Sequence, residues 1–177
     1  YPGEITCYVS YDLTEDNELV INYKVTTPDL SIANLTNHTY FNLNGDGSPT
    51  ILNHFLKINS EKFNEVNSSI IPTGNLLAVE NTPLDFREFK MIGADIEANY
   101  EQLQLCGGFD HNYVLKESST VDAIAYSPDT GIQLEMFTNS PGVQLYVGNS
   151  IPENIVGKNG QEYQVRSGFC LETQFYP

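Results

Sequence analysis

The amino-acid sequence predicts an all-β fold, either a sandwich or a barrel. The chain contains many short runs rich in β-branched and aromatic residues, and turn residues such as Gly, Pro, Asn and Asp separate these runs. Its 11 Tyr and 9 Phe, together with many Thr and Val, also favour strands. We find no internal repeat and no linker-like tract, and 177 residues suffice for one core. We therefore expect residues 1–177 to form a single domain.

The first elements form a predicted β-hairpin. Residues 5–11 and 19–25 each have the composition of a strand, and the polar residues 12–18 connect them. A turn at residues 27–29 follows. The apolar run at residues 30–35 then predicts a strand that leads into a histidine-containing segment.

The middle of the chain is predicted to alternate between short strands and polar connections. Residues 52–58 and 76–79 are expected to be strands, and residues 59–69 a polar connection. Residues 91–105 have a helix-like pattern, so we expect one short helix there. The glycine pair at 107–108 should end it.

The last third of the chain shows the clearest alternation. The strands predicted there are residues 121–126, 132–137, 143–147 and 168–175. The first two flank a turn sequence at residues 127–131, which predicts a hairpin. Residues 154–164 are expected to form a polar loop.

The charge of the chain excludes several kinds of partner. With 8 Lys and Arg against 23 Asp and Glu, the net charge is −15. Such a chain cannot neutralise a row of phosphates, so nucleic acid is an unsuitable ligand. An anionic membrane surface is disfavoured for the same reason, and no apolar stretch approaches the roughly 18 residues of a membrane span. A neutral small molecule fits best.

The cysteine pattern indicates neither a disulfide framework nor a metal site. Cys7, Cys106 and Cys170 are odd in number and widely spaced, which predicts free thiols in a reducing compartment. Residues 42–47 look like the start of a calcium loop, but Asn53 stands at the twelfth position, where a bidentate Glu is needed. We expect a plain turn there, and no metal or cofactor.

The three histidines differ in their surroundings. His38 lies in residues 37–43 (NHTYFNL), and a histidine can give or take a proton near neutral pH. The residues alone leave a catalytic and a structural role open. His54 lies in an apolar run, which favours a structural role. Asp110 and His111 follow the double glycine, so Asp110 is a candidate ligand group that His111 orients, or else a cap of a turn.

The closing strand supplies a candidate base. Strand alternation places Cys170, Glu172 and Gln174 on one face, and a carboxylate in mid-strand faces either solvent or a polar cavity. Glu172 would be ionised at neutral pH and could act as a general base. Gln144 and Tyr146 share a face of their own strand and are typical sugar-contacting side chains. The chain has no nucleophile elbow and no Gly-rich phosphate loop.

Several segments, in order along the chain, resemble the aldose 1-epimerases, also called galactose mutarotases. They are residues 37–43, 71–74, 83–87, 108–113, 139–146 and 170–174. The resemblance implies a large all-β sandwich of the galactose mutarotase type (the supersandwich), here lacking its N-terminal part. Residues 1–177 would be the C-terminal part of that sandwich.

The resemblance also implies an activity, the interconversion of the α and β anomers of hexoses such as galactose and glucose. By this resemblance Glu172 would remove the proton of the anomeric hydroxyl, and His38 would protonate the ring oxygen. Asp110 and Gln144 would bind sugar hydroxyls. No cofactor or metal would take part.

Two alternatives remain beside this reading. A hexose-6-phosphate 1-epimerase of the same fold would need clustered Arg or Lys for its phosphate, and a non-catalytic carbohydrate-binding β-sandwich would need only the polar pocket. The family's sugar-binding Arg and second His lie upstream of Tyr1, so we expect weak or no epimerase activity from these residues alone, and pairing with the missing N-terminal portion or with a second copy. A cytoplasmic location is expected, since a glycan on the formal acceptor Asn37 would obstruct His38.

Overall fold

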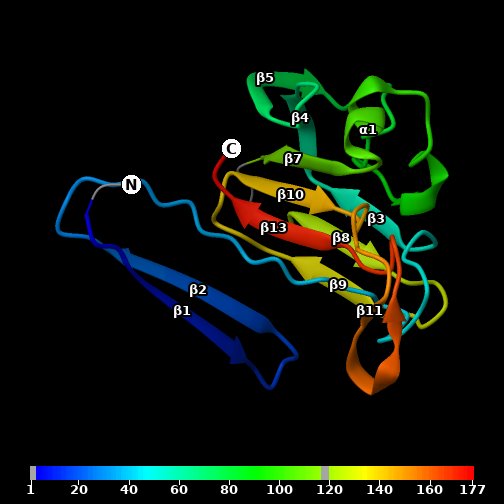
Figure 1. The fold of residues 1–177 in the computed structure, drawn as a ribbon, viewed down its shortest axis with the longest axis horizontal. Helices are drawn as coiled ribbons and strands as arrows, with labels where there is room; N and C mark the ends of the chain where they lie inside the picture. Colours follow the sequence, from blue (N-terminus) through cyan, green and yellow to red (C-terminus); the bar gives the residue numbers. More distant parts are fainter. Residues whose placement is uncertain (1–2, 117–119) are drawn as a thin grey trace. The chain divides into compact units, whose positions relative to one another are not determined.

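The computed structural model describes residues 3–116 and 120–177. The chain forms two compact units, Tyr1–Leu35 and Thr36–Pro177, which are described separately. Figure 1 shows the elements of both.

The first unit is the predicted β-hairpin. Strands β1 (Thr6–Leu13) and β2 (Leu19–Thr26) pair antiparallel along their whole length. The strand expected at residues 30–35 is wrong: within the described part of the chain this run forms no ladder. An apolar run becomes a strand only where a neighbour accepts its backbone hydrogen bonds. After β2, the next backbone pairing is at Phe41, which forms an isolated antiparallel bridge with Phe169.

Among the described residues, the second unit contains two large antiparallel sheets and one small two-stranded sheet. The five-stranded sheet has the order β13 (Cys170–Gln174), β10 (Gly142–Tyr146), β7 (Asp110–Leu115), β4 (Ser60–Val66) and β5 (Pro72–Ala78). The four-stranded sheet has the order β6 (Lys90–Met91), β3 (Phe55–Ile58), β8 (Ala123–Tyr126) and β9 (Gln133–Met136). The hairpin predicted from residues 121–137 is confirmed as β8 and β9, and the strands predicted at 143–147 and 168–175 are confirmed as β10 and β13.

One apolar core joins the two sheets. It receives Phe63, Tyr113, Val143, Leu145 and Leu171 from the five-stranded sheet, and Leu56, Ile58, Ala123 and Ala125 from the four-stranded sheet. The sheets are therefore the two layers of a sandwich. Because side chains alternate along a strand, the polar residues between these core positions lie on the opposite face of the five-stranded sheet.

Strand β4 corrects the prediction of a polar connection at residues 59–69. Phe63 is fully buried in the core, whereas the adjacent Asn64 belongs to the polar face. Register shifts near Ser60 and Val66 interrupt the pairing of β4 with its neighbours. These bulges break the simple alternation, so the sequence pattern hid a strand in the middle of the sheet.

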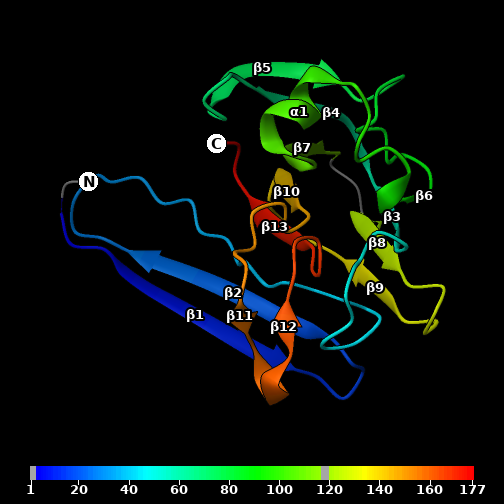
Figure 2. The ribbon, with the colours of Figure 1, turned by 45° about the vertical axis from the view of Figure 1, so that its right-hand side comes forward.

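The helical content is small, as predicted. A 3-10 turn, η1, covers Ile92–Ala94, and helix α1 covers Glu101–Cys106. Gly107 ends α1 in the left-handed region at φ 66°. Helix α1 lies beside β4 (Figure 2), where Gln102 donates to the Val66 carbonyl and accepts from its N–H, both at 2.9 Å.

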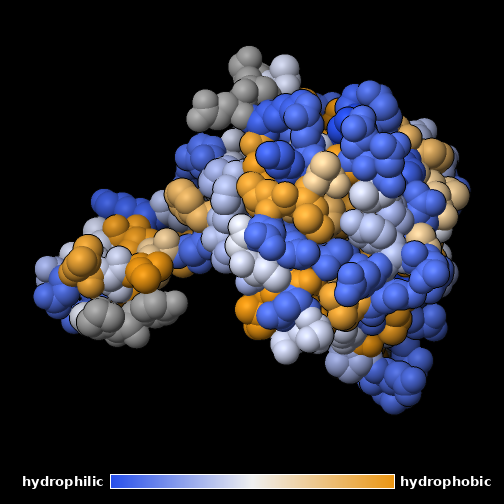
Figure 3. All heavy atoms as spheres, turned by 90° about the horizontal axis from the view of Figure 1, so that it is seen from above, coloured by the Kyte–Doolittle hydropathy of each residue, from blue (hydrophilic) through white to orange (hydrophobic). Residues whose placement is uncertain are grey.

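Residues 154–164 form a small hairpin and not a plain loop. Strands β11 (Ile155–Val156) and β12 (Glu162–Tyr163) pair across a 3-10 turn, η2 (Lys158–Gly160). Hydrophilic residues cover much of the surface visible in Figure 3, with apolar patches between them. Among residues 3–116 and 120–177, none of the helices has the length and apolar character needed to cross a bilayer.

Candidate active site

A polar cavity of about 560 Å³ lies on the outer face of the five-stranded sheet. Small-molecule pockets in proteins have volumes of roughly 300–1,000 Å³. Its polar lining includes His38, Asp110, Asn112, Gln144, Tyr146 and Glu172. All four residues singled out in the sequence, His38, Asp110, Gln144 and Glu172, therefore line one cavity.

The register of three neighbouring strands assembles the floor of this cavity. Two rows of residues run across β13, β10 and β7: Glu172, Gln144 and Asn112 in one, and Cys170, Tyr146 and Asp110 in the other. Residues opposite each other on adjacent strands have Cβ atoms about 4.5–5.5 Å apart. Side chains far apart in the sequence thus become direct neighbours on one face.

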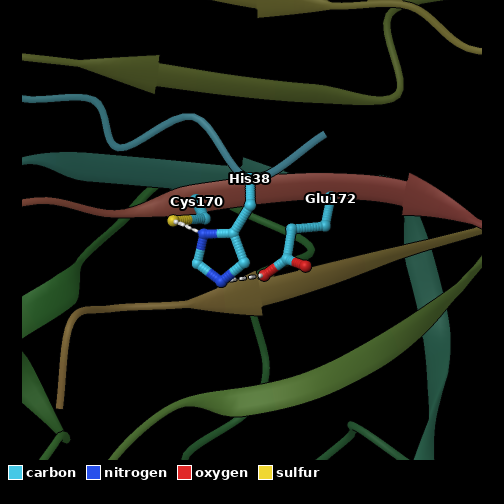
Figure 4. Close-up of side chains that lie close together, drawn as sticks. All are labelled: His38, Cys170 and Glu172. Carbon is cyan, nitrogen blue, oxygen red and sulfur yellow. Dashed lines mark hydrogen bonds and ion pairs between the residues drawn. The ribbon is translucent and has the colours of Figure 1, made fainter. Parts of the chain in front are cut away.

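His38 reaches this floor from the extended segment that precedes the Phe41–Phe169 bridge. Its Nε2 lies 3.4 Å from Oε1 of Glu172 (Figure 4). The His38 side chain is 50% exposed, whereas that of Glu172 is 12% exposed. The pair therefore combines a group open to a ligand with a carboxylate held at the cavity floor.

Cys170 lies on the other side of the same ring. Its Sγ is 3.4 Å from Nδ1 of His38, so the two ring nitrogens face different residues of β13. His38, Cys170 and Glu172 place three potential metal-ligating atoms within 4.8 Å of one another. One ion could not replace both ring contacts, since Nδ1 and Nε2 point in different directions. The arrangement is that of a histidine held between two partners.

Asp110 and Gln144 form a second polar pair in the cavity. Gln144 Nε2 donates to Asp110 Oδ1 at 2.6 Å. Burial raises the pKa of Asp110, while the hydrogen bond from Gln144 and the positive charge that His38 can carry act in the opposite direction. The hydrogen bond fixes one carboxylate oxygen and leaves the other available to a ligand hydroxyl.

The cavity changes the acidity of its own groups. Burial raises the pKa of Glu172, a His38 charge lowers it, and the nearby Asp110 charge raises it. A carboxylate with a raised pKa is a stronger base. Tyr40 also lines the cavity, and burial together with nearby negative groups raises its pKa to about 12. The Tyr40 phenol is therefore neutral near neutral pH.

Four residues that line the cavity, Tyr40, Asn64, Asn112 and Gln174, were not predicted as site residues from the sequence. Asn112 Nδ2 donates to Asn64 Oδ1 at 2.9 Å, and Gln174 Nε2 contacts Asn112 Oδ1 at 3.3 Å. The Tyr40 ring lies 5.0 Å from that of His38. Asn112 could have been found, because it stands at i+2 from Asp110 on the same strand face. Asn64 could not, because it lies on the bulged strand.

The other two histidines lie in the core. His54 is fully buried, and its Nε2 accepts a hydrogen bond from the Leu43 N–H at 2.9 Å, in agreement with the structural role expected for it. His111 is 1% exposed and faces away from the cavity. It contacts Asp110 through the backbone, since its Nδ1 accepts from the Asp110 N–H at 3.2 Å and does not touch the carboxylate. Burial lowers the pKa of His111 to about 4.

The fold and the site together define an antiparallel β-sandwich protein with a histidine–carboxylate pair in a polar cavity. The family model for Aldose 1-epimerase matches residues 1–177, and the chain belongs to this family. The resemblance seen in the sequence is thereby confirmed.

Relatives and solved structures agree with this assignment. The chain is 41% identical over 179 residues to the galactose mutarotase of Rattus norvegicus, and 33% identical over 180 residues to the aldose 1-epimerase of Escherichia coli (strain K12). Each alignment covers 100% of this chain and 51% of the relative, so the chain spans about half the length of these curated relatives.

Two crystal structures confirm the fold type. An aldose epimerase homologue from C. elegans aligns with a TM-score of 0.87 at 29% identity, over 99% of this chain and 52% of that chain. The galactose 1-epimerase of Lactobacillus acidophilus NCFM aligns with a TM-score of 0.85 at 29% identity. This alignment covers 100% of this chain and 50% of that chain. The predicted all-β sandwich of the galactose mutarotase type is confirmed.

Proposed function

We propose that the protein carrying this chain is an aldose 1-epimerase that interconverts the α and β anomers of hexoses such as galactose and glucose. The observation that carries the proposal is the His38–Glu172 pair, 3.4 Å apart at the floor of the cavity. The names of the relatives, galactose mutarotase and aldose 1-epimerase, support it.

Glu172 and His38 suit the two proton transfers of this reaction. Glu172 accepts the proton of the anomeric hydroxyl while protonated His38 donates a proton to the ring oxygen, and the bond between C1 and the ring oxygen breaks. Both oxygens are bonded to C1 before the ring opens, so two adjacent side chains can reach them together. Rotation about C1–C2 then presents the other face of the aldehyde.

Ring closure reverses the two roles. His38 takes the proton back from the hydroxyl that re-forms the ring, and Glu172 returns its proton to the oxygen on C1. No proton is gained or lost overall. A positioned acid or base contributes roughly 10²–10⁴-fold to a rate, and anomers already interconvert slowly in water.

The cavity suits an uncharged sugar. The Asp110–Gln144 pair presents acceptors and donors for hydroxyl groups, and the Asn64–Asn112 pair lies beside it. Within the described residues, neither Lys nor Arg lines the cavity, although a phosphate group would need such side chains. This favours a free hexose over a hexose 6-phosphate.

The proposal also includes the domain organisation of the chain and the cellular location of the protein. Residues 1–177 would belong to one sandwich domain, and the protein would work in the cytoplasm. The three cysteines support a reducing compartment because none of them forms a disulfide with another described residue. The position of the formal glycosylation acceptor Asn37 beside His38 supports it too.

Polarimetry on freshly dissolved α-galactose tests the function. The full-length protein should speed the change in optical rotation beyond the spontaneous rate, and His38→Asn should remove at least about 10²-fold of that acceleration. α-Glucose should also serve, and glucose 6-phosphate should not. Saturable galactose binding with no acceleration would instead identify a carbohydrate-binding protein and refute the proposal.

A further inference from the structure

The His38 imidazole is held at both nitrogens by residues of a single strand. Cys170 and Glu172 stand at i and i+2 on β13, on the same face and about 6.8 Å apart along the strand. Sγ of Cys170 lies 3.4 Å from Nδ1, and Oε1 of Glu172 lies 3.4 Å from Nε2. Because both residues stand on one face of β13, their side chains can reach the same ring.

The chemistry of the partners assigns the protons on the neutral ring. An ionised carboxylate only accepts hydrogen bonds, so Nε2 must carry a hydrogen to bond Glu172. Nδ1 of the neutral imidazole is then an acceptor, and its partner must be a donor. The S–H of Cys170 is such a donor.

The surroundings of Cys170 keep it in the form that can donate. The residue is fully buried. Burial, followed by the charges of Glu172 and Asp110, raises its pKa far above the usual range of a thiol. The thiolate is therefore suppressed, and Cys170 holds its proton next to Nδ1.

We propose that Cys170 is a positioning residue, whose S–H donates to Nδ1 of His38 and holds the neutral imidazole in the tautomer with its hydrogen on Nε2. That hydrogen faces Glu172 and the cavity. The consequence for catalysis rests on the proposed function, whereas the tautomer does not.

A thiol suits a histidine that changes its charge in each turnover. When His38 becomes an imidazolium, and again after its Nε2 proton has passed to the ring oxygen, Nδ1–H can donate to the sulfur once the S–H bond has rotated, so the contact persists through turnover. A carboxylate in the place of Cys170 would add a second negative charge beside Glu172. It would stabilise the imidazolium further and weaken His38 as an acid.

The structure offers a matched control in a second cysteine–histidine contact. Cys106 Sγ lies 3.8 Å from Nε2 of His111, and both residues are buried in the core. Cys106 is not among the residues that line the cavity. Replacing Cys106 removes a buried thiol beside a histidine, and its polar contacts, with His111 and with the main-chain carbonyl of Asp110 at 3.8 Å, do not involve His38.

Several titratable groups face His38, and their charges influence the pH at which its ring gains or loses a proton. They are Glu172 and Cys170 on β13, Asp110 on β7, Tyr146 on β10, and Tyr40 of its own segment.

Side-chain ¹⁵N NMR of the histidines tests the proposal without any sugar. At a pH where His38 is neutral, the full-length wild-type protein should show Nδ1 unprotonated and Nε2 protonated. Cys170→Ala should shift the population toward the other tautomer, Cys170→Ser should retain the wild-type tautomer, and Cys106→Ala should leave His38 unchanged. Protonated Nδ1 in neutral wild-type His38 would overturn the proposal, whether or not the variants fold.

Kinetics of the full-length protein supply the second readout. Cys170→Ala should lower kcat by about 10- to 100-fold, as losing the partner that orients a functional histidine does elsewhere, with little change in KM. Cys170→Ser should recover most of this loss, and Cys106→Ala should cause none. Equal loss in Cys170→Ser and Cys170→Ala would contradict a hydrogen-bonding role. Absence of mutarotation in the wild type would refute the proposed function and leave the tautomer result standing.

Discussion

His38 lies beside Glu172 because an isolated backbone bridge joins Phe41, three residues after His38, to Phe169, three residues before Glu172. Phe41 N–H donates to the Phe169 carbonyl at 2.8 Å, and Phe169 N–H donates back to Phe41 at 2.9 Å. This bridge anchors an otherwise irregular segment to the residue that precedes β13. The acid–base geometry therefore depends on two backbone hydrogen bonds outside the regular ladders of the described residues.

The Asp110–Gln144 hydrogen bond should contribute to sugar binding. Gln144→Ala leaves a partly buried carboxylate without its donor, so we expect galactose affinity to fall by about tenfold, or ~1.5 kcal/mol. Gln133→Ala is the matched control, because Gln133 donates to the exposed Glu135 at a similar 2.6 Å. Calorimetric titration should show the loss only for Gln144→Ala. Equal affinities in both variants would argue against a binding role for the pair.

Removing the charge of Asp110 should change the pH dependence of the reaction. The Asp110 carboxylate raises the pKa of Glu172, so Asp110→Asn should lower that pKa. Glu172 acts as a base only when ionised, and kcat/KM declines as pH falls through its pKa. The acidic limb of the kcat/KM profile should therefore move to lower pH, whatever the loss in absolute rate. A limb that stays in place would show that the two carboxylates do not interact.

The buried His111 should make stability depend on pH. Burial lowers its pKa from 6.5 to about 4, so the unfolded chain binds a proton in this window and the folded chain does not. Stability is full above pH 6.5 and falls as the pH decreases to about 4, by roughly 3 kcal/mol from this residue. In urea titrations between these pH values, His111→Gln should show a flatter dependence. If stability depended on pH equally in His111→Gln and the wild type, groups other than His111 would cause the dependence.

The two consecutive glycines before Asp110 should differ in their tolerance of a side chain. A Cβ at Gly107 (φ 66°) would meet nothing within 4 Å, so Gly107→Ala should cost only the left-handed backbone strain of about 1–2 kcal/mol. A Cβ at Gly108 (φ 141°) would collide with the side-chain amide of Asn149, which donates to the Phe109 carbonyl at 3.0 Å. Chemical denaturation should rank Gly108→Ala as clearly less stable, and the reverse order would contradict the steric explanation.

The sequence predicted the strands that alternate regularly and the residues that stand on them. Gln144 and Glu172 could be placed on polar faces because β10 and β13 keep the two-residue period. The resemblance to the family then connected these faces with His38 and Asp110.

The remaining features depend on tertiary pairing. Asn64 was missed because bulges interrupt β4, and residues 30–35 were predicted as a strand although they form no ladder among the described residues. The contact between Cys170 and Nδ1 of His38 arises only when the segment before Phe41 docks against β13. No local pattern in the sequence encodes it.

The role of Glu172 as the base of an anomer-interconverting site can be tested by comparing two carboxylate variants. Mutarotation of α-galactose should be measured for the full-length protein carrying Glu172→Gln, with galactose affinity measured in parallel. Glu135→Gln, a change at an exposed carboxylate on β9, is the control. Glu172→Gln should lower kcat by at least about 10²-fold while galactose still binds, and Glu135→Gln should match the wild type. Mutarotation at the wild-type rate in Glu172→Gln would rule out Glu172 as the base.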